Sequence, residues 1–205
     1  MKTKEMAIIS IAFVLLIIII ANFMFYNNLD ENFLEVKEGK LIKNKGLAIL
    51  SGEKYAYYLY NNEGVIGNLE FSIKSGMGCL GVDIFTDYSG VCIKSDGTDS
   101  RNSNISFVHP QVAFFKPWML ALEEGWNWKV EYIDKQTDNV IESYIFEVIK
   151  EEKIFGRNSY LVEVTNEEVK VKIWVDKEKR VLLKEINEEY IVEIYSAPFE
   201  LEKDD

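Results

Sequence analysis

The chain has 205 residues, with 34 acidic and 23 basic side chains and a formal net charge of -11. This length fits one folded domain and not a string of several. The negative charge argues against a nucleic-acid surface, which needs clustered lysine and arginine to neutralise phosphates. The chain has two cysteines and only one histidine, so a zinc cluster or a catalytic triad could draw on a single imidazole. We therefore expect no cofactor and no enzymatic activity.

An apolar segment at 6–26 is the strongest local signal in the chain. It carries no charged residue, and at about 1.5 Å per residue it spans about 30 Å, the thickness of the hydrocarbon core. Two lysines precede it and acidic residues follow it, which places the amino terminus in the cytoplasm. We expect residues 1–28 to be an N-terminal signal anchor in the cell membrane, with a single-pass helix at 6–26. The domain at 29–205 then lies outside the cytoplasm.

Two other N-terminal signals begin in a similar way. A cleaved secretory signal peptide also starts with basic residues such as Lys2 and Lys4. Its apolar core is shorter, at roughly 7 to 15 residues, and it ends in a small-x-small pair that is missing after this segment. A prepilin leader is disfavoured because Glu5 precedes the helix and no processing-site glycine is present. An uncleaved anchor fits the segment best.

Beyond the anchor, apolar residues alternate with charged and polar ones in several runs. Strict alternation predicts half-buried antiparallel strands with one face on a core. We expect a mainly β domain, built as a curved antiparallel sheet or incomplete β-barrel with one or two short helices. A two-sheet sandwich of the immunoglobulin kind produces the same alternation and stays open as an alternative. The inward positions are Leu69, Phe71, Ile73, Leu80, Val82, Ile84, Val169, Val171, Ile173, Val175, Tyr190, Val192 and Ile194.

Turn signals separate these runs and predict a meander of hairpins. They lie at 61–64, 87–90, 134–139, 155–158 and 176–179. The best helical candidate is the short segment 116–124, which has Pro117 in its first turn and Gly125 just past its end.

The segment 114–199 carries a recognisable order of parts. Residues 122–128 read Leu-Glu-Glu-Gly-Trp-Asn-Trp, and a hairpin with Gly156 and a strand at 159–165 follow. The segment closes with Ile-Trp-Val-Asp-Lys at 173–177, leading into 181–184. This order resembles the periplasmic lipoprotein-carrier superfamily and related secreted proteins, in which a G-x-x-W element and a Trp-x-Asp hairpin recur. The resemblance covers about two fifths of the 205 residues. It implies a curved antiparallel sheet and the handling of a lipid or other apolar ligand, although a tethered chain cannot shuttle as soluble carriers do.

Aromatic residues are the candidate ligand-lining side chains. Trp118, Trp126 and Trp128 are close in sequence, Phe115 lies just ahead of them, and Trp174 is distant. Broad aromatic faces bury a large area at modest entropic cost, so such rings can line an apolar cavity in a curved sheet. Ordinary core packing explains the same residues, and both interpretations stay open.

Cys79 and Cys92 lie outside the cytoplasm in this topology, where an even number of cysteines favours a disulfide. A tight hairpin through 87–90 would instead place Cys79 opposite a residue near 98, so two buried free thiols are the alternative. Asn104 begins the sequence Asn-Ile-Ser, an acceptor for N-glycosylation on an outward-facing loop.

Metal and acid/base sites find little support. The loop at 95–104 contains Asp96 and Asp99, but it lacks the ligand spacing and the final glutamate of an EF-hand, so we expect a solvated loop. His109 precedes a proline and is expected to be an ordinary structural residue. Paired glutamates stand next to turns, where charge is easily solvated, and they give no acid/base assignment.

Two functions from different classes remain. The first is a non-catalytic protein that binds a lipid or other apolar ligand in the concave face of its sheet. The second is a structural or assembly component of the cell envelope that acts through contacts with a protein partner.

Overall fold

The structure is a computed structural model that describes residues 34–39, 42–75, 81–85, 90–94 and 114–202. The expected anchor helix at 6–26 lies outside these residues, so it stays a prediction. In the part of the chain that is described, no helix has both the length and the apolar character needed to span a bilayer.

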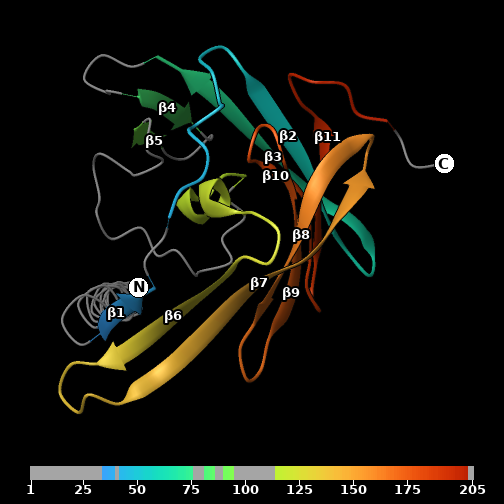
Figure 1. The fold of residues 1–205 in the computed structure, drawn as a ribbon. Coiled ribbons are helices and arrows are strands. Elements are labelled where there is room, and N and C mark those ends of the chain that lie inside the picture. The colour runs from blue at the N-terminus through green and yellow to red at the C-terminus, as the bar shows by residue number, and fades with distance from the viewer. Residues whose placement is uncertain (1–33, 40–41, 76–80, 86–89, 95–113, 203–205) are drawn as a thin grey trace, which may run out of the picture. The chain divides into compact units, whose positions relative to one another are not determined.

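Strands make up most of the described chain, as the alternating pattern predicts (Figure 1). Apart from them there is one short 3-10 helix among the described residues, η1 (Pro117–Ala121). The strands are β1 (Leu34–Glu38), β2 (Lys54–Asn61), β3 (Gly64–Lys74), β4 (Gly81–Phe85), β5 (Gly90–Lys94), β6 (Asn127–Asp134), β7 (Val140–Ile154), β8 (Arg157–Thr165), β9 (Lys170–Asp176), β10 (Leu182–Ile186) and β11 (Ile191–Ser196).

The described residues fall into two compact units, and the smaller one contains 34–37 and 131–142. In this unit β1 neighbours β6, and a turn joins β6 to β7. Asp134 closes that turn: its N–H donates to the carbonyl of Asn139 at 2.9 Å, and its carboxylate accepts the N–H of Gln136 at 2.7 Å. Aspartate favours turns because its side chain can bond to the backbone two residues on. The turn expected at 134–139 is confirmed.

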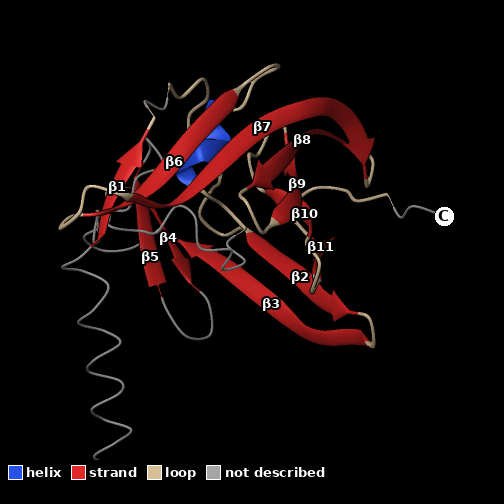
Figure 2. Cartoon of the chain, turned by 90° about the horizontal axis from the view of Figure 1, so that it is seen from below, coloured by secondary structure: helices blue, strands red, loops and turns tan. Residues whose placement is uncertain are grey.

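The larger unit holds one open antiparallel sheet. Its strand order is β6-β7-β8-β9-β10-β11-β2-β3-β4-β5. Neighbours in sequence mostly pair as hairpins, while β11 crosses to pair with β2, so that Ile194 lies opposite Tyr57. Figure 2 shows β2 and β3 as one long two-stranded ribbon within this unit. The expected meander of antiparallel hairpins is therefore present.

Hairpin turns form at the expected positions within the described residues, whereas most of the turn expected at 87–90 falls on residues that the structure does not describe. Phe155 and Gly156 join β7 to β8 with φ values of 51° and 75°, and Ile154 pairs with Arg157 across them. Two adjacent residues with positive φ make the primed turn that matches the twist of a two-residue hairpin. Asn61 pairs with Gly64 at the β2–β3 turn, which confirms a second expected turn.

One face of this sheet, the inner face, carries the core. On it Val148 of β7 lies opposite Val162 of β8, which lies opposite Ile173 of β9. The expected inward residues that the structure finds buried are Phe71, Ile73, Val171, Ile173, Val175, Val192 and Ile194. The expectation for Val169 is wrong, because this residue precedes β9 and is 43% exposed.

The helix expected at 116–124 is shorter than predicted. It ends at Ala121, because Leu122 is already extended with ψ at 132°. Pro117 starts the helix as expected, since its fixed φ suits a first helical position. All five residues of η1 are buried, and its Leu120 carbonyl accepts the N–H groups of residues 44 and 45. Long-range contacts of this kind hold a helix too short to be stable alone.

Candidate functional site

Three of the five aromatic residues selected from the sequence come together in the structure. The Trp118 ring on η1 stacks on Trp126 with centroids 6.1 Å apart, and Trp126 stacks on Trp128 of β6 at 6.4 Å. Phe146 of β7 joins them, with its centroid 5.4 Å from Trp118 and 5.1 Å from Trp128. We refer to these four residues as the tryptophan cluster. Phe146 was not selected from the sequence, although its alternation in β7 could have indicated it.

The cluster is fixed by polar contacts as well as by packing. The indole Nε1 of Trp128 donates to the carbonyl of Gly39 at 2.8 Å. A Cβ on residue 39 would lie 3.1 Å from Cδ1 of Trp128, so glycine permits this close approach. The N–H of Val148 donates to the carbonyl of Trp126 at 2.9 Å, which ties β7 to the cluster.

Exposure differs among the three tryptophans. Trp118 is 1% and Trp128 is 4% exposed, whereas Trp126 is half-buried. Trp126 is therefore the ring of the cluster that a ligand can contact without displacing the others.

The other two selected aromatics lie in different surroundings. Phe115 is buried. Its neighbour Phe114 stacks on Tyr55 with centroids 4.9 Å apart and contacts the tilted ring of Phe71 at 4.7 Å. Trp174 lies opposite Leu161, on the face of β9 away from Ile173. Its Nε1 donates to Glu152 at 2.7 Å. The structure does not bring Trp174 to the tryptophan cluster.

A carboxyl group lies on the inner face, where the sequence analysis expected only apolar side chains. Glu185 of β10 is 6% exposed and pairs with Ile173 and Val192, which are both buried. Burial raises the pKa of Glu185, while the hydroxyl of Tyr190, donating at 3.0 Å, and the charge of Lys116 oppose the increase. The same desolvation lowers the pKa of Lys116. This face thus combines aromatic rings with one polar group.

A second, polar site forms where the β7–β8 and β9–β10 hairpins end. The Asp176 side chain is 1% exposed and accepts Nε of Arg157 at 2.8 Å. It also accepts the N–H groups of Glu178 and Lys179 at 2.9 and 2.6 Å, which closes the β9–β10 turn. The Arg157 guanidinium also lies 4.5 Å from the ring centroid of Phe199. These contacts confirm the expected turn at 176–179 and give the Arg157 side chain a fixed position.

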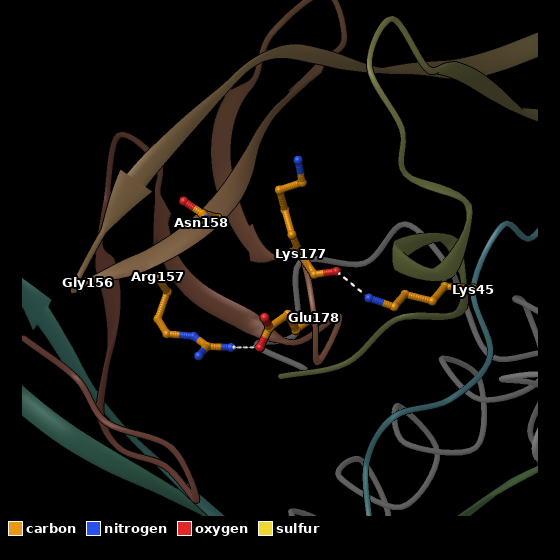
Figure 3. Close-up of a pocket in the computed structure, with 6 residues that line it drawn as sticks. All are labelled: Lys45, Gly156, Arg157, Asn158, Lys177 and Glu178. Atoms are coloured by element: carbon orange, nitrogen blue, oxygen red, sulfur yellow. Dashed lines mark hydrogen bonds and ion pairs between the residues drawn. The ribbon is translucent and has the colours of Figure 1, made fainter.

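Beside this turn is a pocket of about 320 Å³. Figure 3 shows Arg157 and Lys45 reaching toward it from opposite sides. Nη2 of Arg157 donates to Glu178 at 2.8 Å, and Nζ of Lys45 donates to the carbonyl of Lys177 at 2.9 Å. We refer to this place as the hairpin pocket. Its lining residues are Lys45, Gly156, Arg157, Asn158, Lys177 and Glu178.

The remaining selected residues give no geometry for a site. Cys92 is in β5, where it pairs with Asp83, and Cys79 lies outside the described residues, as do Asn104, Asp96, Asp99 and His109. Among the residues that the structure does describe, no group of three or more His, Cys, Asp or Glu side chains could hold a metal ion.

Comparison with known proteins places the chain in no family. No family model matches it, and no curated protein matches it. Two structures of PNGF-II, in the C2 and P21 space groups, align over 75% of this chain with 10% identity and a TM-score of 0.34. The alignment spans 28% and 29% of those chains, and a score this low supports no statement about fold or function. The fold and the described sites therefore define only a mainly β protein with one open antiparallel sheet.

Proposed function

We propose that this chain is a membrane-anchored, non-catalytic binding protein. The helix at 6–26 anchors it with the amino terminus in the cytoplasm, and residues 29–205 face the outside. In this proposal the open sheet is curved into an incomplete barrel, and a lipid or other apolar group lies against its concave face. The resemblance to lipoprotein carriers supports the same class of ligand.

The observation that carries the proposal is the tryptophan cluster. Two buried rings, Trp118 and Trp128, support the half-buried ring of Trp126 at 6.1 and 6.4 Å. A rigid aromatic surface of this kind contacts an acyl chain with little loss of side-chain entropy. Glu185 and Tyr190 add a polar group on the inner face, and binding pockets combine an apolar lining with few polar groups that fix orientation.

Native mass spectrometry of the full chain, extracted from its host membrane in a mild detergent, tests this proposal. We expect a wild-type adduct with the mass of an acyl-containing ligand, and its loss in Trp126→Ala. Trp174→Ala is the matched control, because it removes a half-buried indole from the opposite face of β9. Lipids bound to the anchor helix would persist in all three proteins. Equal adducts in wild type, Trp126→Ala and Trp174→Ala would contradict ligand binding at the cluster.

Topology needs its own test. Ser100→Cys, in the segment 95–104 that the sequence predicts to be a loop, should react with a membrane-impermeant thiol reagent on intact cells. It should react more strongly than wild type with its native cysteines. Labelling only after lysis would contradict the outside location.

The second candidate function is a structural or assembly role in the cell envelope. It is favoured by exposed apolar and aromatic side chains on β2, β3 and β11. The rings of Tyr58 and Tyr195 stack at 4.0 Å and are 36% and 37% exposed. Val65 and Ile66 at the start of β3 are 58% and 55% exposed. Such exposed groups are typical of protein contact surfaces. This role would be favoured if the full chain cross-links to a partner in its membrane and Tyr58→Ser loses the cross-link, while wild type carries no ligand adduct.

A further inference from the structure

We propose that the hairpin pocket binds the phosphate group of a phosphate ester. This inference does not rest on apolar-ligand binding, because it depends on other residues and on other variants.

Two cationic side chains at the hairpin pocket have unused hydrogen-bonding capacity. Arg157 spends Nε and Nη2 on Asp176 and Glu178, which leaves Nη1 with two N–H groups and no partner in the described part of the chain. The ammonium of Lys45 donates to one carbonyl and pairs with no carboxylate among the described residues. A guanidinium and an ammonium at one pocket provide charged donors of the kind that phosphate oxygens accept.

A carboxylate already occupies part of the pocket. Glu178 accepts Nη2 of Arg157 at 2.8 Å, yet its side chain is 76% exposed. A carboxylate this exposed gains little from an ion pair, so an incoming oxyanion can replace Glu178 at small cost. Glu178 thus shows how an oxyanion approaches Arg157, and it rotates into solvent when a phosphate enters.

The Arg157 side chain is held in place before any ligand binds. Asp176, at 1% side-chain exposure, fixes the guanidinium plane of Arg157, and Phe199 packs against that plane at 4.5 Å. Figure 3 shows the Lys177 ammonium pointing away from Glu178; it pairs with Glu151 at 2.5 Å. In this proposal the phosphate lies in the pocket that Arg157 and Lys45 both line. A pocket of about 320 Å³ has room for a tetrahedral phosphate and the first atoms of its ester.

A phosphate ester has two sources, a lipid headgroup or a soluble metabolite, and calorimetric titration of the full chain in a maltoside detergent separates them. The probes are glycerol 3-phosphate and a short-chain phosphatidylglycerol. Glycerol 3-phosphate should bind at least as tightly as the phospholipid if the source is a soluble ester, and the phospholipid should bind more tightly if the source is a headgroup.

The variants test the site itself. Lys45→Met should weaken binding of the bound probe about tenfold, since a charged hydrogen bond is lost. Glu178→Gln should strengthen binding severalfold because a competing carboxylate is gone. Lys54→Met, which removes an exposed lysine at the start of β2, is the matched control and should leave affinity unchanged. Arg157 is not substituted, because its loss would leave Asp176 buried without its charged partner. The proposal would be overturned if neither wild type nor Glu178→Gln binds either probe. It would also be overturned if Lys45→Met and wild type bind with equal affinity.

Discussion

Replacement of Trp128 by alanine measures how tightly the tryptophan cluster is packed. The ring is 4% exposed, stacks on Trp126 and contacts Phe146 at 5.1 Å between centroids. Removing a buried tryptophan side chain costs about 3 to 5 kcal/mol, from lost burial and from the void that remains. Trp128→Phe keeps a ring but removes the donor to Gly39. That variant should lose about 0.5 to 1.5 kcal/mol, the usual net contribution of one hydrogen bond, because Gly39 is exposed and water can reach its carbonyl.

The assay is urea unfolding of the full chain in a maltoside detergent, followed by far-ultraviolet circular dichroism. Circular dichroism reports the sheet, whereas the tryptophan fluorescence signal would itself change in these variants. The slope of the unfolding free energy against urea should stay constant, which shows that the midpoint shift is a change in stability. Trp174→Ala is the control, and its half-buried position predicts a smaller loss than Trp128→Ala.

A small loss of stability in Trp128→Ala would refute this interpretation. A loss of less than about 1 kcal/mol is typical of surface substitutions and mild core changes. If Trp128→Ala loses no more than that, the Trp128 ring is not tightly packed by its neighbours. The interpretation of Trp128 as packed core would then be wrong, and the interpretation as ligand-lining would gain support.

Two further predictions concern Glu185 and Gly156. Burial raises the pKa of Glu185 in the folded chain. Between the ordinary carboxyl pKa and this raised pKa, the folded chain therefore holds a proton that the unfolded chain releases. The free energy of unfolding falls as the pH rises through this range. The amide oxygen of Glu185→Gln still accepts the Tyr190 hydroxyl, but the amide cannot titrate. The unfolding free energy of this variant minus that of wild type should therefore rise with pH. A difference that stays constant with pH would contradict this prediction. Gly156→Ala should lose about 1 to 3 kcal/mol because its φ is 75°, a left-handed conformation that strains alanine. The Glu202 side chain, which would lie 2.6 Å from the new Cβ, is 72% exposed and can move aside. Gly46→Ala, with nothing within 4 Å, is its control, and equal thermal midpoints for the two variants would refute the argument.

The features that the sequence predicts correctly depend on neighbouring residues. The β9 alternation places Val171, Ile173 and Val175 inward because successive side chains of a strand point to opposite faces. The turn at Phe155 and Gly156 is likewise a local property, since glycine accepts the positive φ that the hairpin needs. No partner strand has to be known for either prediction.

The features that the sequence analysis missed depend on the register between strands. Glu185 looks like a solvated charge near a turn, and only its pairing with Ile173 and Val192 shows that it faces the core. The pairing of β11 with β2 brings Ile194 opposite Tyr57 across most of the domain sequence. Alternation within one strand contains no information on such partners.

The candidate sites illustrate the same division. Period-two alternation alone separates Trp174 from Ile173 and Val175, so the strand pattern already implied that this ring lies on the face away from them. Grouping it with Trp126 relied on its chemical type and ignored its position in the strand. The hairpin pocket had no such local signal, because Lys45 and Arg157 are far apart in the sequence and meet only through the carbonyl of Lys177 and the turn at Asp176. A binding site made from two turns and a distant lysine exists only once the sheet has formed, and its residues carry no shared pattern before that.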